Sequence, residues 1–155
     1  MFQKIKAALS QNRNRGVSEN SELEQTRLAC AALLVRAAWL DGKKEDIEQE
    51  AMVKLMIQRF QIDEIKALEI LDDANEDLVS SNDIYRYTRV LRNYFGEQER
   101  LELFEMLWEV IYSDGQVHDF ESNLMRRLAG LLYVSDKDSA QARRRALTKL
   151  GLACF

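Results

Sequence analysis

Proline is absent from this chain of 155 residues, and cysteine and histidine are almost absent. Without proline, no helix carries the residue that most strongly breaks helices, so turns must rely on Gly, Asn and Asp. Two cysteines without a Cys-x-x-Cys pair, together with one histidine, are too few for a disulfide framework or a thiolate metal site. These absences favour a helical protein without disulfides.

Long apolar runs are also missing. No stretch approaches the roughly 18 consecutive apolar residues that a membrane-spanning helix needs, and the first ten residues lack an apolar segment long enough for a secretory signal. The composition, with 46% hydrophobic and 31% charged residues, is typical of one globular domain that buries a substantial core. We therefore predict a cytoplasmic protein.

Positive charge is scarce in the middle of the chain. The net charge is −4, but residues 1–16 and residues 137–155 each carry +4, so the middle carries −12. An acidic body makes general binding to nucleic acid unfavourable, and we expect no nucleic-acid partner. The middle can instead attract cations, and the two ends can attract acidic surfaces.

The first twenty residues differ from the rest of the chain. Phe2, Ile5 and Leu9 lie on one face of a predicted amphipathic helix, and residues 11–20 are polar enough for a linker. We interpret residues 1–20 as this helix with its linker and residues 21–155 as the main helical domain. Residues 1–10 either pack on that domain or make a peripheral contact with a membrane surface or a partner protein.

Apolar side chains recur at helical spacing over the main domain, and no segment alternates with the period of a strand. Helices are predicted over approximately these ranges: 21–40, 46–60, 63–75, 83–95, 97–113, 120–131 and 135–150. In the third of them, Ile65, Leu68 and Leu71 are predicted to face the core. The expected fold is all-α, a compact bundle of seven or eight helices.

An Asp-Gly pair occurs twice, each time between two predicted helices. A shift of 73 positions superposes the two pairs and their surroundings without a gap, placing Asp41 on Asp114, Gly42 on Gly115, Glu48 on Glu121, Phe60 on Tyr133 and Asp63 on Asp136. An ungapped match of this length predicts two helix–loop–helix repeats related by a pseudo-twofold axis, because the period is too long for a short solenoid repeat.

The repeated loop has two interpretations. In the structural one, glycine ends a helix with a positive φ, and acids in the first turn of the next helix contribute roughly 0.3–1 kcal/mol each. In the functional one, the two loops lie together and bind Ca²⁺, Mg²⁺ or Mn²⁺, which prefer oxygen ligands. The candidate metal ligands are Asp41, Glu48, Asp114 and Glu121, supplemented by His118 and Asp119.

We predict no catalytic residues. His118 has no evident Ser or Cys partner, and the chain contains no Gly-rich phosphate loop. Paired carboxylates could serve a metal-dependent hydrolase, but such pairs are common on helix surfaces that have no catalytic role. The expected protein is therefore not an enzyme.

Several motifs occur together in a distinctive order: Ala37-Ala38-Trp39-Leu40-Asp41-Gly42, then Asp83-Ile84-Tyr85-Arg86-Tyr87-Thr88-Arg89, then Leu107-Trp108-Glu109-Val110-Ile111-Tyr112-Ser113-Asp114-Gly115, then Leu124-Met125-Arg126-Arg127-Leu128-Ala129. Over residues 22–150 the chain resembles the bacterial TerB-like proteins linked to tellurite resistance, in particular their small stand-alone branch. In the loop of that family, an Asp and a Pro stand where this chain has His118 and Asp119 in its second loop.

The resemblance implies an all-α TerB fold, no enzymatic activity and a role in stress responses. It also implies a divalent metal held by acids around the Asp-Gly loops, and protein partners in larger membrane-associated complexes. The leading prediction is a non-enzymatic helical module that binds a divalent cation. The alternative is a protein-interaction adaptor in which the loops are purely structural.

Overall fold

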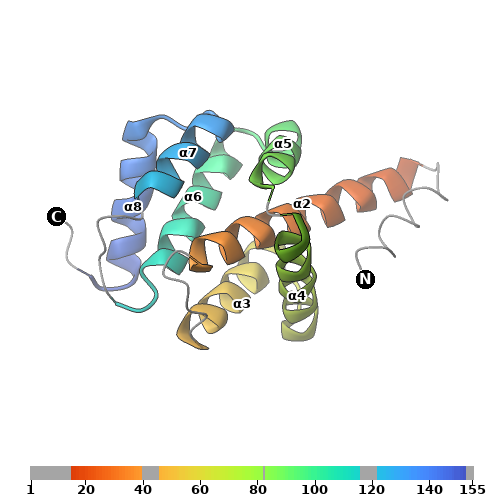
Figure 1. Ribbon diagram of the computed structural model, residues 1–155, viewed down its shortest axis with the longest axis horizontal. Coiled ribbons are helices and arrows are strands. Elements are labelled where there is room, and N and C mark those ends of the chain that lie inside the picture. Colours follow the sequence, from red (N-terminus) through yellow and green to blue (C-terminus); the bar gives the residue numbers. More distant parts are fainter. Residues whose placement is uncertain (1–14, 40–45, 82, 116–121, 153–155) are drawn as a thin grey trace.

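In the computed structural model, the residues that can be described are 15–39, 46–81, 83–115 and 122–152. They form seven helices: α2 (Arg15–Ala38), α3 (Asp46–Phe60), α4 (Glu64–Ser81), α5 (Ile84–Tyr94), α6 (Glu97–Ile111), α7 (Ser122–Leu132) and α8 (Asp136–Lys149) (Figure 1). This part of the chain contains no strand, so the predicted all-α bundle is confirmed.

Helix α2 is the centre of the bundle. It packs against α3, α4, α5 and α6, and between Leu28 and Ala38 every residue except Arg36 is buried. A helix that is apolar on all sides is stable only when neighbours surround it. Many of its buried residues are alanines, which let the neighbouring backbones approach closely.

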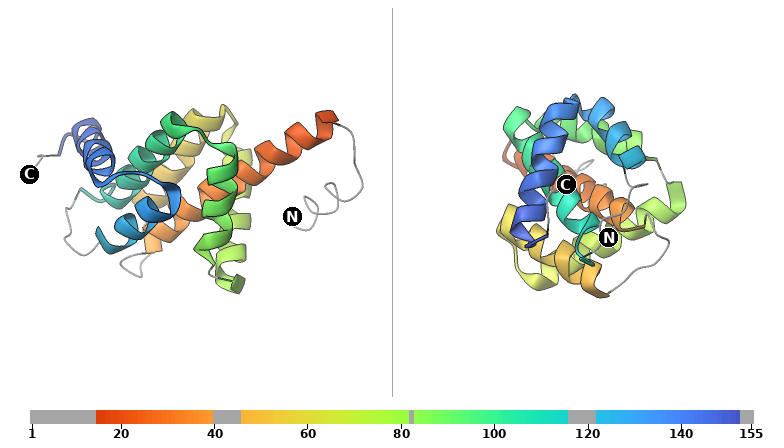
Figure 2. Two further views of the ribbon diagram at one scale, coloured as in Figure 1. Left: turned by 90° about the horizontal axis from the view of Figure 1, so that it is seen from above. Right: turned by 90° about the vertical axis from the view of Figure 1, so that its left-hand side faces the viewer.

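The start of α2 differs from the prediction. The polar linker expected over residues 11–20 is wrong from Arg15 onward, because α2 begins there. The first turns of α2 project beyond the other helices (Figures 1 and 2). Once the buried part of a helix has formed, each further residue adds one hydrogen bond at little cost, so polar residues can extend it.

Helix α4 also corrects the prediction. It continues to Ser81 instead of ending at residue 75, because Ala74 and Leu78 extend its buried stripe by one more turn. Ile65 and Leu68 were expected in the core, but they are 78% and 39% exposed. The stripe that faces α2 instead runs through Ala67, Ile70, Leu71, Ala74 and Leu78, at the i, i+3, i+4, i+7 spacing of a buried helix face.

The two predicted helix–loop–helix repeats correspond to α2–α3 and α6–α7, and the correspondence extends to α4 and α8, with α5 between the two halves. Helix α2 packs on α4 as α6 packs on α8. The shift of 73 positions holds for the buried pairs Met52 with Met125 and Leu55 with Leu128.

The register changes by one residue at the end of α3 and α7. Gln61 and Tyr133, which are 72 positions apart, both have a left-handed backbone, with φ of 53° and 57°. Asp63 and Ser135, again 72 apart, accept the first capping hydrogen bonds of α4 and α8 at 2.7 and 3.1 Å. The predicted pairs Phe60–Tyr133 and Asp63–Asp136 are therefore wrong by one position, because the second repeat is one residue shorter here.

The two halves are joined around Arg59 at the end of α3. Its Nη2 lies 3.2 Å from Oε2 of Glu99, and its Nε lies 3.6 Å from Oε2 of Glu102. Its guanidinium also lies 5.4 Å from the centre of the Phe95 ring. One arginine of the first half thus contacts both ends of the link between α5 and α6.

No helix within the described residues is long and apolar enough to cross a membrane.

Candidate functional site

The second Asp-Gly pair lies in the turn that follows helix α6. Gly115 has a φ of 79°, and its N–H donates to the carbonyl oxygen of Tyr112 at 2.9 Å. Ser113 closes the same turn, because its hydroxyl donates to the carbonyl oxygen of Val110 at 2.7 Å. A left-handed residue that follows a helix is cheapest as glycine. Gly115 therefore has the positive φ that was predicted, but it closes the turn after α6, three residues beyond the C-cap Tyr112, and does not itself end the helix.

Of the six candidate metal ligands, only Asp114 can be placed. It is half-buried directly after the last turn of α6. Glu48 belongs to the first turn of α3, but its side chain is not among the parts that the structure describes. The other four candidates lie wholly outside the described residues: Asp41, His118, Asp119 and Glu121. Within the described part of the chain, no three His, Cys, Asp or Glu side chains are grouped closely enough to hold a metal ion. The predicted ligand set stays a prediction.

The two helices that precede the Asp-Gly pairs are in contact. Helices α2 and α6 pack against each other, and both end in the half of the molecule that carries the C-terminus (Figure 1). The residues that precede the two Asp-Gly pairs thus lie on equivalent helices of the two repeats.

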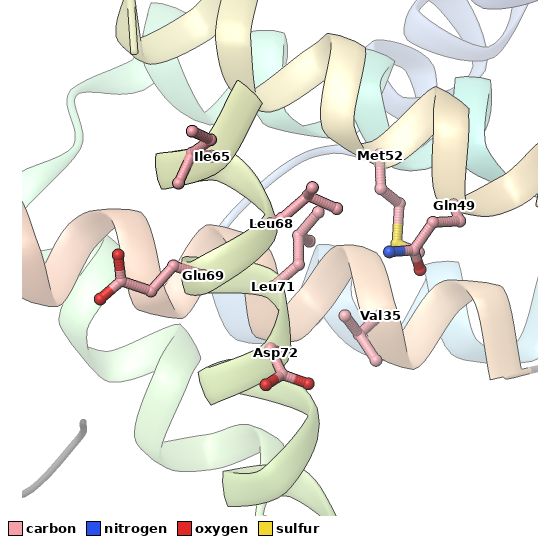
Figure 3. A pocket seen from close by; sticks show the side chains of 8 residues that line it. All are labelled: Val35, Gln49, Met52, Ile65, Leu68, Glu69, Leu71 and Asp72. Carbon is pink, nitrogen blue, oxygen red and sulfur yellow. The ribbon is translucent and has the colours of Figure 1, made fainter. Parts of the chain in front are cut away.

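A groove opens between α3 and α4, above α2, with a volume of about 460 Å³. Its lining side chains are Val35 from α2, Gln49 and Met52 from α3, and Ile65, Leu68, Glu69, Leu71 and Asp72 from α4. In Figure 3, Leu68 and Leu71 point toward Met52, whereas Glu69 points away from it. We call this feature the α3–α4 groove; its floor is apolar and its α4 edge is acidic.

The second repeat explains why the first has a groove. The counterpart of Val35 is Trp108, and at the register of the caps the counterpart of Leu71 is Arg143. The guanidinium of Arg143 lies 5.9 Å from the centre of the Trp108 ring. We attribute the α3–α4 groove to the smaller Val35 and Leu71, which leave open the space that an indole and a guanidinium occupy in the second repeat.

The sequence analysis missed this groove because it placed Ile65 and Leu68 in the core. A signal was present in the sequence: the shift of 73 positions that aligns the loops also aligns Trp108 of the second repeat with Val35 of the first. A difference of this size between equivalent buried positions must be compensated by a neighbour or must leave a space.

A second cleft, of about 480 Å³, lies between the N-terminal half of α2, the ends of α3 and α5, and the start of α6. Arg27 and Arg59 flank the ring of Phe60, with their guanidinium carbons 5.8 and 5.5 Å from its centre. Glu24 pairs with Arg27 at 3.6 Å and Glu99 pairs with Arg59 at 3.2 Å. Because each arginine has a carboxylate and an aromatic ring beside it, this cleft is a structural junction.

A third cleft, of about 560 Å³, is lined by charged residues of α3, α6 and α8. Lys149 donates to Glu105 at 2.8 Å and lies 3.9 Å from Glu109. Burial raises the pKa of Glu109 above its ordinary value, while Lys149 acts to lower it.

Burial also raises the pKa of the Cys30 thiol of α2 to about 12, so this cysteine stays protonated at neutral pH.

Comparison with known families decides the relationship of the chain. The family described as Tellurite resistance protein TerB matches residues 27–144. The chain belongs to the TerB family. The matched TerB region runs from the middle of α2 into α8 and so includes both repeats. No curated protein and no solved structure matches the chain.

Proposed function

We propose that this TerB protein is a non-enzymatic interaction module, an adaptor whose α3–α4 groove receives an amphipathic helix of a partner protein. The exposed apolar side chains of Ile65 and Leu68 carry the proposal, because they continue the apolar floor of the groove outward to solvent. Apolar side chains in a groove between two helices match the way in which an amphipathic helix is bound.

The charge of the groove indicates the chemistry of the partner helix. Glu69 and Asp72 lie along the α4 edge of the groove, and Glu64 and Glu76 add two exposed carboxylates to the same helix. Acidic side chains beside an apolar floor favour lysine or arginine at the flanks of the bound helix. The proposed partner is therefore a basic amphipathic helix.

A labelled amphipathic peptide of leucine and lysine tests the groove by fluorescence anisotropy. We expect Ile65→Ser combined with Leu68→Ser to weaken binding about tenfold, because both changes remove apolar surface that the peptide would bury. Val79→Ser is the matched control: Val79 is 71% exposed on the same helix but does not line the groove. Equal binding by the double variant and the control would refute the proposal.

Cation binding at the Asp-Gly loops is a second proposal. Asp114 supports it, because it is a half-buried acid in the turn between the C-cap of α6, Tyr112, and Gly115. The proposed site binds Ca²⁺, Mg²⁺ or Mn²⁺ through oxygen ligands, with Asp114, Glu121, His118 and Asp119 from the second loop and Asp41 and Glu48 from the first. A role in the response to tellurite or another stress is proposed from family membership alone.

Calorimetry with Ca²⁺, Mg²⁺, Mn²⁺ and Zn²⁺ tests the site. We expect binding heat for one of the first three ions, and its loss in Asp114→Ala but not in the control Glu64→Ala, an exposed acid at the start of α4. If Asp114→Ala lowers stability equally with and without the ion, the loop has only a structural role. The cation proposal is then refuted, and the adaptor proposal is unaffected.

A further inference from the structure

Helices α5 and α7 have an unusual composition for a chain with a net charge of −4. Helix α5 contains three arginines and helix α7 contains two, and neither helix contains an aspartate, a glutamate or a lysine. The two helices pack side by side at the top of Figure 1. Five arginines from distant parts of the sequence are thus gathered on one side of an acidic protein.

The outer sides of these helices form what we call the Arg–Tyr face. Its members are Tyr85, Arg89 and Arg92 from α5, Arg126 and Arg127 from α7, and Tyr133, which directly follows α7. Tyr85 is 56% exposed and Tyr133 is 72% exposed. Large aromatic rings with this much exposure are the side chains, together with arginine, that protein interfaces most often use as anchors.

Two contacts across the helices orient two of these arginines, Arg127 and Arg92. Arg127 of α7 lies over the ring of Tyr85, 5.6 Å from its centre. Arg92 of α5 lies 5.4 Å from the centre of the Tyr133 ring and donates to the Tyr133 hydroxyl at 3.1 Å. A guanidinium stacked on a ring keeps N–H donors at its edge, in a plane already set for a carboxylate.

The part of the fold that the structure describes leaves most of this charge without an ion pair. Over the residues that the structure describes, four of the five arginines have no carboxylate at ion-pair distance; Arg86 is the exception and pairs with Asp77. The basic residues of α8 are different, because Arg145 and Lys149 both pair with Glu105. The positive potential of the Arg–Tyr face is therefore available to a ligand.

We infer that the Arg–Tyr face binds an acidic segment of a partner protein, with its Asp and Glu carboxylates on Arg89, Arg92, Arg126 and Arg127. Charge complementarity selects the sign of the partner. The acidic remainder of the chain disfavours a nucleic acid, which extends beyond a small basic patch and would meet repulsion there. This surface is built from α5 and α7 and lies outside the lining of the α3–α4 groove, so it is independent of the function proposed above.

The probe is a fluorescein-labelled peptide of alternating glutamate and leucine, followed by anisotropy at low and moderate salt. We expect Arg89→Gln combined with Arg126→Gln to weaken binding about tenfold, since two carboxylate contacts are lost. The matched control, Lys54→Gln with Arg144→Gln, removes the same charge from exposed positions on α3 and α8 and should change affinity less than about twofold.

Three further measurements decide the class of ligand. Replacing Arg89 and Arg126 by lysine keeps the charge, and we expect it to recover only part of the affinity, because lysine cannot make a two-point contact with a carboxylate. A single-stranded DNA oligonucleotide and phosphatidylglycerol vesicles should bind less tightly than the peptide. Equal effects of the double variant and its control, or tighter binding of the DNA or the vesicles, would overturn the inference.

Discussion

Arg143 of α8 donates a hydrogen bond from Nε to the hydroxyl of Tyr112, at 2.8 Å, where α6 ends. Its guanidinium also lies 5.5 Å from the centre of the Tyr112 ring, which stacks on Trp108 with 5.6 Å between ring centres. The last helix of the chain thereby holds the end of α6, directly before Asp114. The position of the second Asp-Gly pair depends on this contact between helices that lie far apart in the sequence.

The first prediction concerns this contact. We expect Arg143→Met to lower the free energy of unfolding by about 1–3 kcal/mol, because the hydrogen bond and the cation–π contacts are lost while the volume is largely kept. Urea denaturation measures the change. Lys137→Met, at an exposed position on the same helix, is the control and should change stability by less than about 0.5 kcal/mol.

A double-mutant cycle with Tyr112→Phe separates the hydrogen bond from the packing. The coupling energy between Arg143 and Tyr112 should be about 0.5–1.5 kcal/mol. A coupling energy near zero would show that Arg143 stabilises α8 by other contacts.

The second prediction concerns the end of α3. Gln61 adopts a φ of 53°, which costs a residue with a side chain more than it costs glycine. We expect Gln61→Gly to stabilise the protein by about 0.5–1 kcal/mol in urea denaturation. Gln58→Gly, exposed within α3, should instead destabilise it by about 1 kcal/mol, because glycine disfavours a helix interior. If both variants changed stability in the same direction, the φ of Gln61 would not be the cause.

The third prediction concerns pH. Burial raises the pKa of Glu109 in the folded protein, so between the unfolded and folded pKa values the folded state binds more protons. Stability from this group is therefore lost as pH rises through that interval. We expect Glu109→Gln to gain stability relative to the wild type as the pH rises from the ordinary glutamate pKa through the raised pKa of the folded protein, measured by urea denaturation at each pH.

A control for the pH prediction is Glu97→Gln, which removes one exposed carboxylate from the start of the same helix. The gain should appear in Glu109→Gln and not in this control. A difference between Glu109→Gln and the wild type that stays constant with pH would contradict the prediction.

The fourth prediction concerns the reactivity of Cys30, which is buried and has a pKa raised to about 12. In a Cys154→Ser variant, the Cys30 thiol should react with Ellman's reagent at about pH 8 only as fast as the protein unfolds, because the reagent needs an accessible thiolate. Reaction should become complete in denaturing urea. A fast reaction in native buffer would show that the core around α2 opens locally.

Local signals in the sequence were sufficient for most of the fold. The predicted helix over 83–95 is confirmed: its stripe Ile84, Thr88, Leu91 and Phe95 is buried, and Asp83 caps α5 by accepting from the N–H of Tyr85 at 3.1 Å. Ser135 caps α8 in the same way. Such features depend on residues three or four positions apart, so they can be recognised without knowledge of the fold.

The candidate interaction surfaces could not be predicted from local sequence patterns in this way. Ile65 and Leu68 fit a helical stripe in the sequence, but the true stripe of α4 is rotated toward Ile70 and Ala74. Which stripe faces inward depends on how α4 lies on α2, a relationship that periodicity within one helix does not contain. The α3–α4 groove could not be predicted for the same reason.

The sequence by itself determined the seven helices, their repeat and the glycine of the turn after α6, because these follow from spacing, capping and the conformational freedom of glycine at Gly115. Only the tertiary structure decided which side chains form the α3–α4 groove and the Arg–Tyr face. Val35 leaves a groove in one repeat where Trp108 packs with Arg143 in the other. Arg127 meets Tyr85 only because α5 and α7 pack together. Packing between helices brings together residues that no local pattern relates.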